Sequence, residues 1–583
     1  MSESTTDGTW FGDSELLERF PAWTRGNAAD VFPDPFSPLG QSLVIREGMA
    51  MGLRDGYISS APWIGTSTRS PFARTCSRCS APAKYFRKVT TSLTRVLGAR
   101  MPGASPEAID QAFFDDRDEV PKYVAEPWHE SERHAAKLGE TMAQVMSIDT
   151  LPELDADKAI VESLRDSRPD LSAMSDGALL ARARSMVPWV QKTFETAMWV
   201  SSMSSLGPGA LSAICEGIGQ PSLAIRLLGG VEVDSAAPSH AMWALATFAR
   251  NSAAVNGAFE AGVDGVLDAL AASSDPDAAQ FLADFQQFLH DYGSRAQNEY
   301  DIISPSWEVK PVIALRAIDL MRKSPDSQAP SVRHTSTIAD RDAAAAEVRA
   351  LVAGDPETAG LFEAALKSAH LFLSGRERGK TNTIMVIGEI RMALREFGRR
   401  LVERGVISQV EQLFMVTNDE LDHLRHDPEA FVDTIAERWA QYRSLFDREP
   451  VFVVNGRVPS LEEMTVRATK NLPQATSGTV LTGAAGSGGS ATGRARVVLD
   501  AADPTGLEPG DVLIAPQTDP SWVPLFVPAA AVVVNVGAMG SHAMIVSREL
   551  GIPCVVSVVD ATDTIPDGAM VTVDGTAGTV TIH

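Results

Sequence analysis

Residues 532–556, VVVNVGAMGSHAMIVSRELGIPCVV, combine a histidine with glycines and a helix start in a way that suits anion chemistry. The pattern predicts a strand, a glycine-containing loop and a short helix. Ser541 stands at the N-cap position, His542 is the first helical residue, and Gly551 follows the last one.

A helix N-terminus offers unpaired N–H groups and the positive end of the helix dipole to an anion. Gly537 and Gly540 would let the backbone approach that anion closely. A neutral imidazole at His542 can attack a phosphoryl group, and the helix end would stabilise the phosphohistidine formed. By spacing alone, an ordinary surface histidine at a helix cap is an equal alternative.

A second group of residues could hold phosphoryl oxygens. Arg376 and Lys380 are spaced i, i+4, so that on a helix both project from one face. Arginine binds an oxyanion through a planar fork and lysine as a point charge. Glu377 would orient one of these cations or act as a base. The alternative is a solvated charged run at a helix bend near Gly375 and Gly379.

A third group follows the sequence Tyr292-Gly293-Ser294-Arg295. Arg295 and Glu299, again spaced i, i+4, form either a structural ion pair or part of a site. The candidate substrate-binding residues here are Arg295, Glu299 and Trp307, and Asp301 lies among them. The remaining histidines offer weak base candidates at His290 and His370, whereas His583 is expected to be inert.

Composition excludes several classes of partner. The 583 residues predict three to four domains, and 44% hydrophobic with 22% charged residues is typical of a globular protein. A net charge of −24 argues against nucleic acid or an anionic membrane as the main partner. The start of the chain lacks a signal-peptide pattern, and no apolar run is long enough to span a bilayer, so we expect a cytoplasmic protein.

Cysteine usage points to no metal site. Cys76 and Cys79 form a C-x-x-C pair, but zinc needs four ligands and the other two cysteines, Cys215 and Cys554, are isolated. Four cysteines in a chain of this length are also no disulfide framework. We therefore predict neither a metal nor disulfides, and a chance or structural pair at positions 76 and 79.

Helical periodicity dominates from about residue 100 to 450. One helix is predicted to begin after Asp275 and to end at Gly293, a second to run from about 355 to at least 374, and a third over 383–405. Ser239 is predicted to cap a helix over 240–251. The first 100 residues, rich in Pro, Gly, Ser and Thr, are predicted to be extended or irregular.

The pattern changes near residue 473. Short β-like runs, RARVVLD, DVLIAP, AAVVVNV, CVVSVV, MVTVDG and GTVTIH, are separated by turn residues. We therefore expect a multi-domain α and α/β protein, in which a large, mainly helical domain precedes a small α/β domain. The predicted divisions are 1–100 for the irregular N-terminal segment, 101–470 for the helical domain and 471–583 for the α/β domain, with a hinge at about 455–478.

The C-terminal motif resembles a known family. The sequence GAMGSHAMIVSRELGIPCVV, with GSATGRARVV and LEPGDVLIAP upstream, is similar to the phosphohistidine swivelling domain of the phosphoenolpyruvate-utilising enzymes. The resemblance implies that His542 becomes phosphorylated and carries the group between two sites. The group includes the rifampicin phosphotransferases and phenylphosphate synthase.

The helical part resembles the acceptor-substrate domain of the rifampicin phosphotransferases. Four segments carry the likeness, at 28–39, 227–246, 291–311 and 374–421. The resemblance implies that Arg376, Glu377 and Lys380 belong to a recurring Arg-Glu-x-x-Lys motif at the transfer site. Where relatives have Tyr-Gly-His-Arg, Ser294 replaces the histidine, so their substrate cannot simply be carried over.

Two modules of the family are not expected here. The likeness to the acceptor domain begins near residue 28, which leaves no room for an ATP-grasp domain of about 200 residues. Only 41 residues follow His542, too few for a phosphoenolpyruvate-binding barrel. The resemblance therefore implies that ATP and Mg²⁺ are bound by a separate ATP-grasp subunit and not by this chain alone.

The function implied is that of an ATP-dependent phosphotransferase subunit, in which ATP ends as AMP and phosphate. His542 would pass phosphate to the hydroxyl of a small aromatic compound resembling phenol or cresol, at Arg376 and Lys380. The alternative is a non-catalytic phosphocarrier or regulatory protein that signals through phosphorylated His542.

Overall fold

The computed structural model describes most of the chain. The described residues are 22–25, 32, 34–59, 82–83, 86–87, 89–100, 105–107, 110, 120–127, 129–455, 459–467, 472–504, 506–537 and 541–583. Cys76, Cys79 and Gly540 lie outside them, as does much of the predicted N-terminal segment.

A large helical body forms the first part of the molecule. Its longest element is α18 (Pro356–Glu403), which packs against α7, α8, α9 and α10. The other helices of this body are η1 (Gly40–Met49), α2 (Ala50–Ser59), α4 (Thr91–Arg100), α6 (Glu132–Ser147), α7 (Pro152–Asp166), α8 (Asp176–Ser185), α9 (Val187–Met203), α10 (Leu206–Gly217), α19 (Leu421–His426) and α20 (Val432–Ser444). A small sheet in the order β4 (Val89–Thr90), β1 (Ala22–Thr24), β5 (Val453–Asn455) joins distant parts of the chain.

The prediction of irregular structure over residues 1–100 is wrong for α2 and α4. Helix α2 packs closely on α9, and its glycines make this approach possible. A Cβ at Gly52 would lie 2.5 Å from the carbonyl oxygen of Gln191, and one at Gly56 2.7 Å from that of Glu195. Glycines often indicate loops when the sequence is considered alone, but Gly52 and Gly56 allow two helices to pack closely.

A smaller helical lobe and a long arm follow in the chain. The lobe contains α12 (Ala237–Asn251), α13 (Ala253–Glu260), α14 (Val266–Ala271), α15 (Pro276–Tyr292) and α16 (Val312–Arg322), and the arm is α17 (Pro330–Val352) with α11 (Leu223–Leu227) beside it. Helix α15 confirms the prediction at Asp275, whose carboxylate accepts the backbone N–H of Asp277 at 2.9 Å.

Two predicted helix boundaries are wrong. Ser239 does not cap α12, because the helix begins two residues earlier and Ser239 is buried within it. The two predicted helices over 355–374 and 383–405 are one continuous helix of 48 residues, α18.

The C-terminal part is an α/β domain, as predicted. Its sheet has the order β6-β13-β12-β8-β9-β10-β11-β7, with β8, β9, β10 and β11 mutually parallel and the other pairs antiparallel. The strands are β6 (Val480–Thr482), β7 (Ala484–Ser487), β8 (Ser490–Val497), β9 (Val512–Ala515), β10 (Ala531–Val534), β11 (Cys554–Val556), β12 (Met570–Asp574) and β13 (Thr579–Ile582). The helices are α21 (Val523–Phe526), α22 (His542–Leu550) and α23 (Ala561–Thr564).

All six predicted strands exist, and β6 and β7 were missed. Strand β7 falls within the Gly-, Ser- and Ala-rich stretch at 481–493, whose small residues hide a strand signal. Ala475 already donates its backbone N–H to the carbonyl of Thr564, so the chain joins the α/β domain inside the predicted hinge of 455–478.

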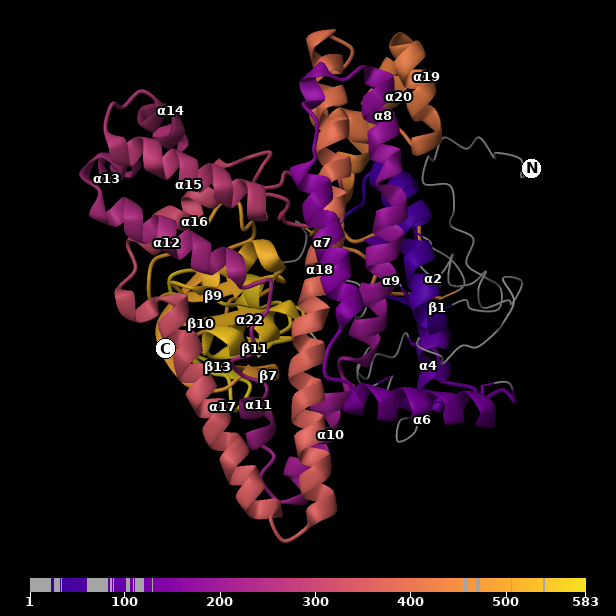
Figure 1. Ribbon diagram of the computed structural model, residues 1–583, viewed down its shortest axis with the longest axis vertical. Helices are drawn as coiled ribbons and strands as arrows, with labels where there is room; N and C mark the ends of the chain where they lie inside the picture. The colour runs from indigo at the N-terminus through magenta and orange to yellow at the C-terminus, as the bar shows by residue number, and fades with distance from the viewer. Residues whose placement is uncertain are drawn as a thin grey trace.

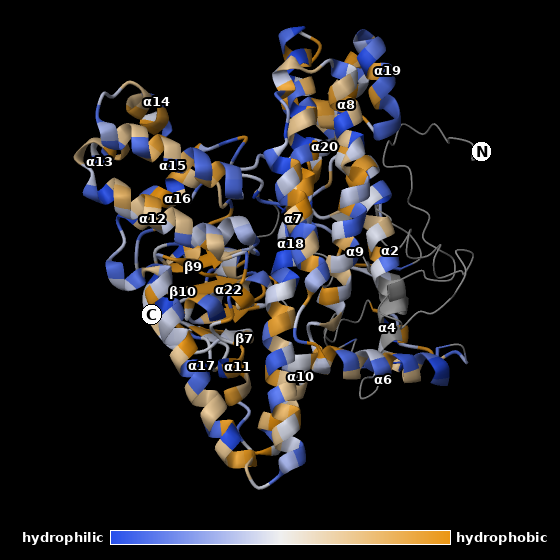
Figure 2. Cartoon of the chain, viewed as in Figure 1, coloured by the Kyte–Doolittle hydropathy of each residue, from blue (hydrophilic) through white to orange (hydrophobic). Residues whose placement is uncertain are grey.

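The α/β domain lies between α17 and α18, below the α12–α16 lobe (Figure 1). Side chains of the lobe, including Trp307, share one hydrophobic core with those of the domain, including Trp522 and Phe526. Figure 2 shows hydrophobic residues concentrated on β9, β10 and α22. Burial of this shared core holds the start of α22 against the lobe.

Candidate active site

Helix α22 places His542 at the interface between the two parts of the molecule. The helix begins at His542, as predicted, and ends at Gly551, whose φ of +61° is the left-handed conformation that glycine favours. Ser541 occupies the N-cap position, but its side chain makes no capping hydrogen bond. Ile545 of the same helix packs in one cluster with Leu373 of α18, so the helix is seated against α18.

The imidazole of His542 is buried, with only 5% of the residue exposed. Its Nδ1 lies 3.1 Å from the hydroxyl of Thr518, whereas Nε2 has no hydrogen-bond partner among the described residues. Burial lowers the pKa of His542 well below 6.5, and the nearby cations Lys380, Arg295 and Arg376 lower it further. The ring is therefore neutral at pH 7 and presents an unshared electron pair at one nitrogen.

Arg376 and Lys380 stand on α18, and the positive charges of both act on His542. The Lys380 ammonium is 3.3 Å from Oε1 of Glu299 and 5.7 Å from the centre of the Tyr300 ring. Burial by itself lowers the pKa of Lys380, but the surrounding negative charges, Glu299 first among them, raise it above its ordinary value. Lys380 therefore stays a cation in a buried place.

Gly375 and Gly379 lie within the continuous helix α18 and face α7 and α9. A Cβ at Gly375 would lie 2.5 Å from the end of the Leu151 side chain, and one at Gly379 would lie 2.9 Å from the Cα of Ala197. The glycines let α18 approach its neighbours closely on one face. The adjacent face then carries Arg376 and Lys380 toward the α/β domain.

The predicted pair of Arg295 and Glu299 is formed and is buried. One guanidinium nitrogen is 3.4 Å from the Glu299 carboxylate, and another donates to the hydroxyl of Thr381 at 2.6 Å. Because Glu299 also reaches Lys380, the pair is part of the cationic cluster and not an isolated surface contact. A buried ion pair of this kind holds its members in one geometry.

Two further carboxylates lie in this cluster. Glu377 is 3% exposed, and its Oε2 has no hydrogen-bond partner in the described part of the chain. Asp519 comes from the α/β domain, and burial, reinforced by the charge of Glu299, raises its pKa to about 6. The site therefore combines three cations and three carboxylates around a neutral histidine.

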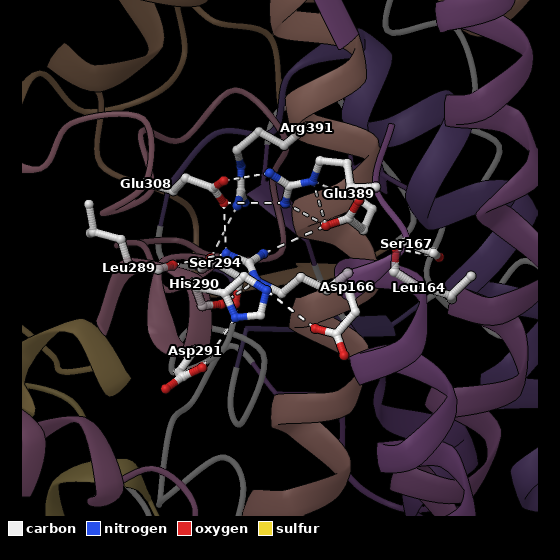
Figure 3. Close-up of polar contacts among 12 residues, drawn as sticks. Leu164, Asp166, Ser167, Leu289, His290, Asp291, Ser294, Glu308, Glu389 and Arg391 are labelled. Atoms are coloured by element: carbon white, nitrogen blue, oxygen red, sulfur yellow. Dashed lines mark hydrogen bonds and ion pairs between the residues drawn. The ribbon is translucent and has the colours of Figure 1, made fainter. Parts of the chain in front are cut away.

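A buried ion network anchors the loop that carries Arg295. Arg168 contacts both Glu389 of α18 and Glu308 at 2.5 Å, and Arg165 donates to the Leu289 carbonyl at 2.9 Å. Figure 3 shows Glu389, Glu308 and Leu289 among the polar contacts of this network. Arg391 donates to the carbonyls of Ser294, Glu299 and Asp301 at 2.8–3.2 Å. These bonds fix residues 289–308 against α18.

Ser294, at the position where the resemblance predicts a histidine, lies against α18. A Cβ at Gly388 of α18 would lie 3.0 Å from the Ser294 Cβ, so the two elements are in direct contact there. Ser294 is itself buried. The position serves packing in this chain.

Other predicted residues lie elsewhere. Trp307 is 1% exposed and stacks on Phe288 in the hydrophobic core, so it does not line the cluster. Asp301 accepts the N–H and hydroxyl of Ser37, both at 2.6 Å, and ties down the N-terminal segment.

The remaining histidines also have structural contacts. His290 is half-exposed beside Asp166 and Asp291. Nε2 of His370 lies 2.8 Å from the carbonyl of Leu227, and that of His583 lies 2.7 Å from the Thr572 hydroxyl. None of these contacts is shared with His542.

Sequence reasoning missed Thr518, Asp519, Tyr300 and Arg391. The run Thr518-Asp519-Pro520-Ser521 does carry the signal of an Asp-capped turn. Nothing in its spacing relative to His542 shows that the turn meets the histidine. Over the described residues, no cluster of three or more His, Cys, Asp or Glu is arranged to hold a metal. In the same part of the chain, no helix has the length and apolar composition to cross a membrane.

Two segments of the chain match family models of known proteins. Residues 507–578 match the mobile domain of PEP-utilising enzymes, and residues 188–377 match the fourth domain of rifampicin phosphotransferase. In these two regions the chain is therefore similar to PEP-utilising enzymes and rifampicin phosphotransferase. The first match contains His542, and the second contains Arg295 and Arg376 but stops before Lys380.

The similar proteins are larger than this chain. It is 28% identical to an uncharacterized protein of Mycobacterium tuberculosis (strain ATCC 25618 / H37Rv), over 97% of this chain and 62% of that protein. It is 30% identical to the rifampicin phosphotransferase of Streptomyces sviceus over 56% of this chain and 37% of the relative, and 29% identical to that of Bacillus subtilis (strain 168) over 51% and 34%. The chain thus spans between a third and two thirds of these relatives.

Proposed function

We propose that this chain belongs to the PEP-utilising enzymes and is the phosphohistidine-carrying and acceptor-binding part of an ATP-dependent phosphotransferase. The observation that carries the proposal is the buried, neutral His542, whose unpartnered Nε2 lies in a cluster with Arg295, Arg376 and Lys380. A nucleophilic nitrogen beside three cations suits a dianionic phosphoryl group.

The transfer step uses this chain's own residues. The acceptor hydroxyl attacks the phosphorus of phosphorylated His542, the P–N bond breaks, and its electron pair returns to Nε2. Arg376 and Lys380 stabilise the phosphoryl oxygens as charge spreads over them. The buried Glu377 carboxylate takes the hydroxyl proton, since Oε2 has no partner among the described residues.

The acceptor proposed is a small aromatic hydroxyl compound of the phenol or cresol kind. A phenol has a pKa of about 10, so its deprotonation at pH 7 needs a nearby base or cation. Both are present in the cluster. ATP and Mg²⁺ are assigned to a separate ATP-grasp subunit, which would phosphorylate His542 after the α/β domain turns away from α18.

The test is a labelling experiment with this chain, candidate ATP-grasp partners, γ- or β-labelled ATP and a panel of phenols. Wild type should take up acid-labile label and pass it to one phenol, and His542→Ala should take up none. Label retained by His542→Ala would refute the assignment of the carrier residue.

The second candidate is a phosphocarrier or regulator without an acceptor. The burial of a complete set of cations and carboxylates next to His542 favours the enzyme, because a carrier has no need of it. A wild-type protein that is labelled but transfers phosphate to no small hydroxyl compound, only to another protein, would favour the carrier.

A further inference from the structure

The turn at residues 517–522 touches both the catalytic histidine and the helical body. Thr518 of this turn contacts Nδ1 of His542 at 3.1 Å. Asp519, the next residue, accepts the backbone N–H of Asn298 at 3.0 Å. Of two successive residues, one therefore contacts the imidazole and the other contacts the helical part of the molecule.

Asp519 is built into this turn by further bonds. Its Oδ1 accepts the backbone N–H of Ser521 at 2.8 Å and the Ser521 hydroxyl at 2.5 Å, while Oδ2 accepts from Asn298. Asp519 is 8% exposed. With every oxygen engaged by N–H or O–H donors, the carboxylate is suited to holding geometry and not to taking a proton from substrate.

Asn298 is an unusual partner on the helical side. It is one of the few described non-glycine residues with positive φ, at +50°, and it directly precedes Glu299 of the cationic cluster. Its N–H donates to Asp519 of the α/β domain, and Arg391 holds the carbonyls on either side of it, at Ser294 and Glu299. The donor is thus presented by a rigid loop.

The charges that act on Asp519 come from the helical part of the molecule. Glu299 and Lys380 are the ionisable groups that act on it, with opposite signs, and burial is the larger influence on its pKa of about 6. At pH 7.5 the side chain is therefore ionised and can accept all of these hydrogen bonds.

We propose that Asp519 is a positioning residue, which couples the seating of the α/β domain on Asn298 to the orientation of the His542 ring through Thr518. When the domain is seated, the Asp519–Asn298 bond fixes the turn, and the Thr518 hydroxyl then holds Nδ1 so that Nε2 faces the cations. The proposal deepens the proposed function, since it concerns the same histidine, but its test needs neither a donor nor an acceptor.

The test compares wild type, Asp519→Ala and Asp519→Asn at pH 7.5. Hydrogen–deuterium exchange is followed in a peptide containing Asn298, and the ring-nitrogen shifts of His542 are measured in ¹⁵N-histidine-labelled protein, assigned with His542→Asn. Asp574→Ala is the matched control. Asp574 also accepts two backbone N–H groups, those of Thr576 and Ala577, but within the α/β domain.

Asp519→Ala should speed exchange of the Asn298 amide by about ten- to a hundredfold, as expected when a hydrogen bond to a charged acceptor is lost. It should also shift the His542 nitrogens toward a mixture of tautomers. Asp519→Asn keeps one acceptor oxygen, so both its exchange rate and its nitrogen shifts should fall between those of wild type and Asp519→Ala. Asp574→Ala should match wild type in both measurements.

Two results would overturn the proposal. One is a folded Asp519→Ala, or a folded Asp519→Asn if the alanine variant does not fold, with both readouts as in wild type. The other is a change at His542 without faster exchange at Asn298, because Asp519 would then act only through its own turn. Either result leaves phosphorylation of His542 untouched, so it is distinguishable from failure of the proposed function.

Discussion

Gly379→Ala is expected to disturb the site by moving the helix that carries Lys380. A new methyl group at this position would lie 2.9 Å from both Cα and Cβ of Ala197 in α9. Ordinary carbon contacts are about 3.5–4.0 Å, so α9 and α18 must separate by several tenths of an ångström. One contact is with backbone, which cannot rotate out of the way.

The magnitude follows from two opposing terms. Alanine is favoured over glycine inside a helix by about 1 kcal/mol. Overpacking of this kind costs about 1–3 kcal/mol. The net loss in the free energy of unfolding should therefore be between about 0 and 2 kcal/mol.

Gly360→Ala in the same helix is the matched control. A methyl group added there would have no atom within 4 Å, and the variant should gain about 1 kcal/mol. The free energies of unfolding of the two variants, measured by urea denaturation, should thus differ by about 1–3 kcal/mol. This difference is the cost of overpacking alone, because the propensity gain is the same in both variants. In the labelling assay, Gly379→Ala should also transfer phosphate more slowly, since small displacements of positioned groups cost up to about 10²-fold in rate.

The outcome that would refute this reasoning is clear. If Gly379→Ala is as stable as Gly360→Ala and transfers phosphate at the wild-type rate, close approach of α18 to α9 does not set the position of Lys380.

Three further predictions concern the site itself. Arg376→Ala and Lys380→Ala should each slow transfer to the acceptor by about 10²–10³ while His542 is still labelled; normal turnover, or loss of labelling, would place these residues outside the acceptor site. The lowered pKa of buried His542 stabilises the seated domain above pH 6.5, and this contribution is lost as pH falls. The melting temperature of wild type should therefore fall below that of His542→Asn by a growing margin as the pH drops below 6.5. Parallel curves of melting temperature against pH would contradict the assignment. The raised pKa of Asp519 has the opposite effect on stability, but it is present in both proteins and cancels in the comparison. Calorimetry of this chain with Mg-ATP should show no specific binding, and a micromolar dissociation constant would reveal a nucleotide site in it.

Local sequence signals predicted the elements around His542 well. The strand, the helix from 542 to 550 and its end at Gly551 follow from apolar runs, a start signal and a glycine, which act within a few residues. The Arg376–Lys380 and Arg295–Glu299 spacings likewise depend only on helical or turn geometry. For these features local sequence patterns and the family resemblance of the motif were sufficient.

The tertiary structure decided which side of each helix is used. Glycines at 52, 56, 375 and 379 suggest loops or bends locally, yet each lies where two helices pack closely. Trp307 and Asp301 are near Arg295 in sequence, but Trp307 packs in the hydrophobic core and Asp301 binds Ser37. Long-range packing outweighs local preference at such positions, because burial of large apolar faces exceeds differences in propensity of about 1 kcal/mol.

The same holds for the site as a whole. Thr518 and Asp519 reach His542 and Asn298 only because β9 and β10 are neighbours in the sheet and because the α/β domain shares a hydrophobic core with the helical lobe. Asn298 and Asp519 are 221 residues apart in the chain. The sequence alone determined which chemical groups this protein has and where the helices after Asp275, Asp355 and Ser541 start. The meeting of those groups in one buried cluster depended on contacts between distant segments, for which local spacing carries no signal.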